Sequence, residues 1–153
     1  MVGVDSSGFA VETAQDNARL NGLAARVHFV REDAQKYMSQ LLKEGQAASF
    51  DIVILDPPKL APTRQSLSKA SRLYQRLNAA ALRLVAPGGL LLTCTCSSAM
   101  TQSGNFPSVV SAAATDAQRQ VTLLQVSGAA IDHLTTIDYP ESRYLTAMLL
   151  SVT

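Results

Sequence analysis

The sequence predicts an α/β fold with a mostly parallel, doubly wound sheet. Short β-rich segments alternate with segments of helical periodicity along the 153 residues, and this order is typical of parallel strands joined by helical crossovers. Several of the β-rich segments are apolar runs that end in an acidic or polar residue. The length is sufficient for one domain with a real hydrophobic core. We therefore expect a single α/β domain over residues 1–153.

Ten elements are expected. In chain order they are a strand over residues 2–5, a helix over 9–21, a strand over 27–30, a helix over 34–44, a strand over 50–55, a helix over 66–85, a strand over 90–98, a helix over 106–119, and strands over 121–126 and 144–152, with loops over 60–65 and 101–107. The hydroxyls of Ser6 and Ser7 suit the cap of the first helix, and Gly22 suits its left-handed end. Residues 86–89 are expected to form a sharp turn. The last two strands have no helix between them, so one of them is expected to be antiparallel, at the sheet edge.

The segment over residues 50–59 is the central feature of the predicted sheet. Its short continuous apolar run is typical of a strand that is covered on both faces, and the run ends in Asp56. Pro57 and Pro58 end the strand and stiffen the exit loop, because each fixes φ and lacks a backbone donor. The Asp56 carboxylate and the Lys59 ammonium are thus expected at the sheet edge where open α/β folds bind ligands. The alternative is an ordinary strand end with a solvated aspartate.

Polar groups also end the neighbouring expected strands. Asp5, Asp33, Asp56 and the Cys96-Ser97 pair each follow a β-rich segment, and right-handed crossovers bring such ends to one edge of a sheet. An acid at a strand end is suited to bind ribose hydroxyls, as in dinucleotide folds. The pattern therefore favours an adenosine-containing cofactor.

Charge is unevenly distributed, although the formal net charge is only +1. No acidic residue occurs between Asp56 and Asp116. The basic residues of that interval are Lys59, Arg64, Lys69, Arg72, Arg76 and Arg83. Such a block could face a polyanion, or it could be the solvated face of one helix. No apolar run reaches the roughly 18 residues that a membrane helix requires, and no metal site is expected.

Several short motifs together resemble one family. They are Val4-Asp5-Ser6-Ser7, Asn17 with Asn21-Gly22-Leu23, Glu32-Asp33-Ala34, Asp56-Pro57-Pro58-Lys59, Pro87-Gly88-Gly89, Thr95-Cys96-Ser97, Tyr139-Pro140-Glu141 and Tyr144-Leu145. The set resembles class I S-adenosylmethionine-dependent methyltransferases, and is most similar to the large-subunit ribosomal RNA cytosine-5 methyltransferases that carry an N-terminal PUA domain. The resemblance implies a Rossmann-like methyltransferase sheet, an S-adenosylmethionine cofactor and an RNA substrate in the cytoplasm.

The resemblance also implies roles for the strand-end residues. Asp5, with Ser6 beside it, would hold the ribose hydroxyls of the cofactor. Asp33 and the backbone amide of Ala34 would address its adenine. Asp56 would line the reacting methyl group and the target base.

By the same resemblance, Cys96 would be the nucleophile. Carbon 5 of a pyrimidine is a poor nucleophile, and a thiolate that adds to carbon 6 makes carbon 5 enamine-like, which splits one difficult step into easier ones. A cysteine in this role needs a lowered pKa or a basic neighbour, and Lys59 is a candidate neighbour. The alternative for Cys96 is a small buried hydrophobic residue. Cys94 is expected to pack in the core, and the two cysteines are not expected to pair, as suits a reducing compartment.

The chain departs from the family at its start. The family's first, central strand and its Gly-rich loop would precede Val2, as would the PUA domain. We therefore expect residues 1–153 to be a partial methyltransferase catalytic domain that binds S-adenosylmethionine weakly alone. The flanking strands could re-pair directly, or a missing N-terminal segment or a second copy in a homodimer could complete the sheet. Two other functions stay open, namely a methyltransferase acting on a base nitrogen and a non-catalytic RNA-binding or scaffold domain.

Overall fold

The computed structural model of the protein describes residues 1–139 and 142–153. Pro140 and Glu141, which belong to one of the quoted motifs, lie outside the described residues. The described strands form two separate sheets, and the chain divides into two units, Met1–Gly45 and Gln46–Thr153. Both units combine helices with strands, as the sequence predicts.

The first unit is a β-α-β arrangement followed by a helix. Strand β1 (Val2–Asp5) pairs in parallel with β2 (His28–Arg31), and helix α1 (Gly8–Leu20) connects them. Helix α2 (Ala34–Lys43) follows β2. The predicted cap and the predicted left-handed end of α1 are confirmed. Ser7 Oγ accepts a hydrogen bond from the Ala10 amide at 3.2 Å, and Gly22 has φ +66°.

The second unit is a four-stranded mixed sheet in the order β3-β4-β6-β5. Its strands are β3 (Phe50–Leu55), β4 (Val85–Thr95), β5 (Val121–Ser127) and β6 (Thr146–Val152). β3 and β4 are parallel, whereas β6 runs antiparallel to both β4 and β5. The predicted antiparallel strand is confirmed, but its predicted position at the edge is wrong. β6 lies between β4 and β5 and is hydrogen-bonded to both. Its direction is typical of a strand joined to its neighbour by a loop, since parallel neighbours need a crossover connection, but this rule does not determine which strand lies at the edge.

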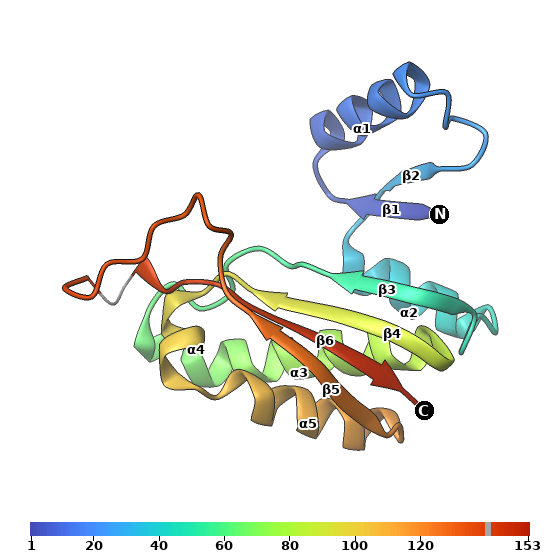
Figure 1. Ribbon diagram of the computed structural model, residues 1–153. Coiled ribbons are helices and arrows are strands. Elements are labelled where there is room, and N and C mark those ends of the chain that lie inside the picture. Colours follow the sequence, from blue (N-terminus) through green and yellow to red (C-terminus); the bar gives the residue numbers. More distant parts are fainter. Residues whose placement is uncertain (140–141) are drawn as a thin grey trace. The chain divides into compact units, whose positions relative to one another are not determined.

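Helices cover one face of this sheet. Helix α3 (Leu67–Leu84) and helix α5 (Phe106–Ala117) pack against each other on the same side of the strands (Figure 1). Most of the largest fully buried side chains are from these helices and from β4 and β6, and they include Tyr74, Phe106, Leu91 and Leu150. The Tyr74 and Phe106 rings meet edge to face with their centroids 5.5 Å apart. The core of the second unit therefore lies between α3, α5 and the central strands.

The prediction that β3 is covered on both faces is wrong. β3 is an edge strand of its sheet, and Ile52 and Ile54 are 60% and 67% exposed. Leu55, which points to the helix-covered face, is buried. A continuous apolar run does not distinguish a central strand from an edge strand with one open apolar face.

Residues 86–89 form a bulge inside β4 instead of a turn before it. The register moves from Phe50 opposite Val85 to Ile52 opposite Leu90. Gly88 has φ +81°, and a Cβ atom on Gly89 would lie 2.7 Å from the Asp51 carbonyl oxygen. Glycine therefore permits both the left-handed backbone and the close approach of the two strands.

Two short helices replace parts of the predicted loops. The 3-10 helix η1 (Arg64–Ser66) begins after Thr63, whose backbone amide donates to Ser66 Oγ at 3.2 Å. Helix α4 (Ser98–Ser103) follows the end of β4 and closes at Gly104 in the left-handed region. Within the described residues, no helix is long and apolar enough to cross a membrane.

Candidate functional site

In the first unit, Asp5 is the last residue of β1, and Asp33 lies just after β2, the strand that pairs in parallel with β1. Asp5 is aligned with Arg31 in the β1–β2 ladder, and Asp33 lies two residues beyond it. The side chains of Asp5 and Asp33 are exposed, as are Ser6 and Ala34. Asp5 and Asp33 thus end neighbouring strands of one sheet. Asp56 and the Cys96-Ser97 pair belong to the other sheet, so the predicted grouping of all four strand ends at one edge stays a prediction.

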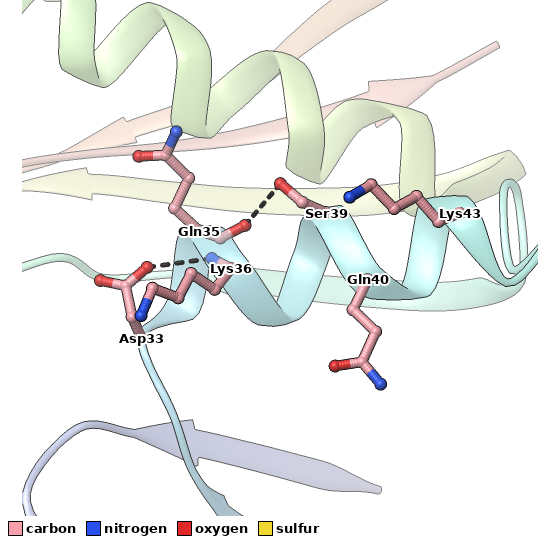
Figure 2. A pocket seen from close by; sticks show the side chains of 6 residues that line it. All are labelled: Asp33, Gln35, Lys36, Ser39, Gln40 and Lys43. Carbon is pink, nitrogen blue, oxygen red and sulfur yellow. Dashed lines mark hydrogen bonds between the residues drawn. The ribbon is translucent and has the colours of Figure 1, made fainter.

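Local hydrogen bonds fix one oxygen of each carboxylate. Asp5 Oδ1 accepts from the Ser7 amide at 2.7 Å. Asp33 Oδ1 accepts from the Lys36 amide at 2.9 Å and so caps α2 (Figure 2). The aspartate at the end of β2 thus has a structural task that sequence reasoning did not assign to it. Both carboxylates are oriented before any ligand arrives.

A polar hollow lies along α2. Figure 2 shows the six residues that line it, which are Asp33, Gln35, Lys36, Ser39, Gln40 and Lys43. All of them come from α2 or its cap, and Ser39 Oγ is bonded to the Gln35 carbonyl at 2.7 Å. Of the predicted cofactor residues, this hollow contains only Asp33.

In the second unit, the structure brings Cys96 to the loop that carries Asp56. β3 and β4 are parallel neighbours with Leu55 opposite Thr93, so the residues that follow them emerge at the same edge. The Cys96 thiol donates to the Pro57 carbonyl oxygen, with Sγ 3.9 Å from that oxygen. Asp56 and Lys59 are exposed and Cys96 is half-buried. The predicted pairing of Cys96 with the Asp-Pro-Pro segment is confirmed.

The thiol at Cys94 has a different environment. It is buried, which confirms its predicted place in the core, and both cysteines are free. Burial raises the pKa of the Cys94 thiol, and the negative charge of Asp56 and then Cys96 add to the shift. Cys94 therefore stays protonated at neutral pH and is not suited to nucleophilic attack.

A buried ring of hydrogen bonds links Thr95 and Ser97, the residues on either side of Cys96, through Tyr74. The Ser97 amide donates to Thr95 Oγ1 at 3.3 Å, and the Thr95 hydroxyl donates to Tyr74 Oη at 2.8 Å. Tyr74 Oη lies 3.2 Å from Ser97 Oγ, which closes the ring. Thr95, Ser97 and Tyr74 are each 0% exposed. The ring therefore fixes the residues on either side of the candidate nucleophile.

The same ring holds the exit loop of β3. The Ala61 amide donates to Ser97 Oγ at 3.0 Å, so one hydroxyl links that loop, α3 and the end of β4. Sequence reasoning missed Tyr74 and Ala61. The hydroxyl residues that flank Cys96 were a signal for such a network, but the partner on α3 could be identified only from the packing.

Comparison with known proteins identifies the fold and the family. A family model described as "Methyltransferase domain" matches residues 1–144. The ribosomal RNA large subunit methyltransferase I of Aeromonas salmonicida is 40% identical over 151 residues, which are 98% of this chain and 37% of that protein. The protein of the same name from Shewanella denitrificans is 39% identical over 150 residues, 97% of this chain and 37% of its own. The chain thus spans little more than a third of these relatives.

Solved methyltransferases have the same fold. The crystal structure of SMU.776, a methyltransferase complexed with SAH, has a TM-score of 0.80 at 22% identity and covers 98% of this chain and 38% of its own. A SAM-dependent methyltransferase from Streptococcus mutans has a TM-score of 0.80 at 20% identity over 98% of this chain and 38% of that one. These likenesses establish a Rossmann-like methyltransferase fold with parallel and antiparallel strands. The match of the family model to residues 1–144 shows that the chain belongs to the methyltransferase domain family.

Proposed function

We propose that the chain is the catalytic region of an S-adenosylmethionine-dependent RNA methyltransferase that forms 5-methylcytosine in large-subunit ribosomal RNA. The relatives' name supports the ribosomal RNA substrate. The single observation that carries the cytosine-5 chemistry is the contact of Cys96 with the Pro57 carbonyl beside Asp56. A cytoplasmic location belongs to the same proposal, and the two free cysteines are consistent with it.

The residues of the first unit fit the proposed cofactor. Asp5 is the last residue of β1, and its carboxylate accepts a hydrogen bond from the Ser7 amide while the residue stays exposed. A carboxylate in this position suits the two hydroxyls of a ribose. Asp5 and Ser6 would hold the ribose, and Asp33 with the Ala34 amide would face the adenine. When bound, S-adenosylmethionine supplies an electrophilic methyl group.

Cys96 performs the covalent steps of the proposed reaction. Its thiolate forms a bond to carbon 6 of cytosine, and the electron pair of the carbon 5–carbon 6 double bond moves to carbon 5, which becomes the nucleophile. After methylation, a base takes the proton from carbon 5. That electron pair restores the double bond and expels the Cys96 thiolate, so the ring exchanges one proton for one methyl group. The Pro57 contact requires a thiol, so Cys96 must give up both the contact and its proton before it attacks.

Asp56 and Lys59 have supporting roles in this proposal. The exposed Asp56 carboxylate follows the strand beside Cys96, where it can accept a hydrogen bond from the cytosine amino group. Lys59 lies three residues further along the same exit loop and would supply positive charge near the thiolate. Among the described residues, no hydrogen bond joins Lys59 to Cys96, so the role proposed for Lys59 is that of a nearby charge.

Nucleoside analysis tests this function. Large-subunit ribosomal RNA fragments are incubated with the chain and millimolar S-adenosylmethionine, and the methylated nucleosides are identified by mass spectrometry. 5-Methylcytidine is the expected product. A methyl group on a base nitrogen would instead support the alternative enzyme, which needs no cysteine. RNA binding without methylation, at an S-adenosylmethionine concentration shown by calorimetry to saturate the chain, would support a non-catalytic domain.

We further propose that residues 1–153 are a partial catalytic domain whose sheet is completed by another strand. Two features support it: β3 is an edge strand with an open apolar face, and β1 and β2 form a sheet of two strands, which is marginally stable by itself. The completing strand would come from an N-terminal segment or a second copy. The chain alone should therefore bind S-adenosylmethionine only weakly. Titration calorimetry checks this, and a micromolar dissociation constant would overturn it.

A further inference from the structure

The exposed face of α3 carries a line of positive side chains. Its members are Lys69, Arg72, Arg76 and Arg83, all exposed, and we call them the basic stripe. At 100° per residue they fall within about 60° of arc, and at 1.5 Å per residue they span about 21 Å of helix. The buried residues of α3, including Ala70, Tyr74 and Ala81, lie on roughly the opposite side. The stripe is therefore a narrow, solvent-facing row of one sign of charge.

Acidic side chains do little to neutralise this row. The ion pairs among the described residues join Arg19 to Asp16 and His133 to Asp132, and neither involves the stripe. Asp116 of α5 is an acid in contact with α3, and its carboxylate accepts from Gln75 Nε2 at 2.7 Å. The Asp116 backbone carbonyl accepts from Arg83 Nη2 at 2.6 Å. Of the four stripe residues, Arg83 is thus the one whose side chain has a hydrogen bond within the described part of the chain.

The stripe is firmly connected to the candidate nucleophile. Tyr74 of α3 lies 3.2 Å from Ser97 Oγ, directly after Cys96, and Ala61 of the β3 exit loop bonds to the same oxygen. Two more exposed cations, Lys59 and Arg64, lie between Asp56 and α3 in the chain. All of these residues belong to the second unit. A polyanion held along α3 would therefore be held in a defined relation to Cys96.

We propose that the basic stripe binds the phosphate backbone of the RNA whose cytosine reacts with Cys96. The inference deepens the proposed function and rests on it for the identity of the polyanion. A merely solvated helix face usually mixes both signs, because oppositely charged residues three or four apart stabilise a helix. Helix α3 contains no acidic residue and so has no such pairs. We infer that its positive charges interact with a negatively charged partner outside the helix. Arg72 and Arg76 suit phosphate in particular, since a guanidinium can donate two parallel hydrogen bonds to it.

Salt-dependent RNA binding tests the stripe. The Cys96→Ala chain is titrated with a labelled single-stranded fragment of large-subunit ribosomal RNA at several salt concentrations, so that no covalent adduct contributes. The stripe variant adds Lys69→Gln, Arg72→Gln and Arg76→Gln. A matched variant adds Arg26→Gln, Lys36→Gln and Lys43→Gln, which removes the same charge from exposed positions of the first unit.

The stripe variant should lose about two units of the slope of log affinity against log salt, since each phosphate contact on a single strand contributes about 0.7. Its affinity at low salt should fall at least about tenfold, whereas the matched variant should keep the parent slope. Equal losses in the two variants would show that net charge alone attracts RNA and would overturn the proposal, as would no RNA binding by the parent. Equally strong displacement of the RNA by poly-glutamate would overturn the assignment to RNA in favour of an acidic protein surface.

These outcomes are separate from those of the catalytic proposal. Because the parent chain here lacks the thiol, a stripe-dependent affinity stands even if Cys96 proves not to be the nucleophile. Conversely, Cys96-dependent methylation that is unaffected by the stripe substitutions would leave the proposed function intact. It would overturn the proposal that the basic stripe binds the RNA.

Discussion

The Cys96 thiol and the Pro57 carbonyl oxygen are in contact, with Sγ 3.9 Å from the oxygen. This contact joins the loops that follow two neighbouring parallel strands, although the two residues are 39 positions apart in the chain. Asp56, the candidate base-binding residue, directly precedes Pro57 in the chain. The candidate nucleophile therefore meets the loop that begins at the candidate base-binding acid, at one sheet edge of the second unit.

Tyr74→Phe should destabilise the chain through the buried ring. The substitution leaves Thr95 and Ser97 without their shared partner in a region from which water is excluded, at a cost of about 1–3 kcal/mol in free energy of unfolding. Urea unfolding measures the loss. Tyr37→Phe, at a half-buried position of α2, is the matched control and should change little. Equal stability of Tyr74→Phe and the parent would show that the ring contributes nothing.

The same variant should loosen the β3 exit loop. The Ala61 amide is bonded to Ser97 Oγ, and this oxygen loses its Tyr74 partner in Tyr74→Phe. Hydrogen exchange at the Ala61 amide should become faster in this variant, while exchange in β6 should change only by the global loss of stability. Unchanged exchange at Ala61 would mean that Tyr74 does not position the loop.

Gly89→Ala should be poorly tolerated. The new methyl group would lie 2.7 Å from the Asp51 carbonyl oxygen, so the bulge must open and the β3–β4 pairing must shift. Overpacking of this kind costs about 1–3 kcal/mol. Gly128→Ala is the control, because the nearest atom to its added carbon is 4.0 Å away. Similar midpoints for the two variants in urea would contradict the close approach.

Stability should fall at alkaline pH because of Cys94. Burial, then the charge of Asp56, raises the pKa of this thiol above its ordinary value of 9.0. The unfolded chain therefore releases the thiol proton at a lower pH than the folded chain does. The contribution is neutral while both states are protonated, and the free energy of unfolding decreases as the pH rises above about 9.

Urea unfolding under reducing conditions on both sides of that pH measures the effect. Cys94→Ala should show a shallower decrease than the parent, since lysine and tyrosine ionisations are common to both chains. Asp56→Asn should also reduce the decrease, because it removes the second cause of the shift. Parallel pH profiles for parent and Cys94→Ala would exclude Cys94 as the source.

The sequence was informative wherever local pattern decides structure. The alternation of elements, the cap at Ser7 and the left-handed Gly22 follow from nearest neighbours in the chain. The meeting of Cys96 with the loop that begins at Asp56 was also predictable, because parallel neighbouring strands end at one edge. Features that are determined by tertiary packing could not be predicted from the sequence. The insertion of β6 between β4 and β5 and the open face of β3 depend on which strands pair.

The candidate site shows the same division. Asp5, Asp33, Asp56 and Cys96 could be named because each ends a recognisable strand. Tyr74 could not be named, because its position in the 3.6-residue periodicity of α3 is that of an ordinary core residue. The role of its hydroxyl depends on the hydrogen bonds to Thr95 and Ser97.

Covalent trapping tests the central claim most directly. RNA that carries 5-fluorocytidine cannot lose its carbon 5 substituent as a proton, so the adduct with the nucleophile persists. With millimolar S-adenosylmethionine, the parent and Cys94→Ala chains should form a complex that survives denaturing electrophoresis, and peptide mapping should place the cross-link at Cys96. Cys96→Ala should form none. A complex of equal yield with Cys96→Ala, or methylation of ordinary RNA by that variant at the parent rate, would contradict the account.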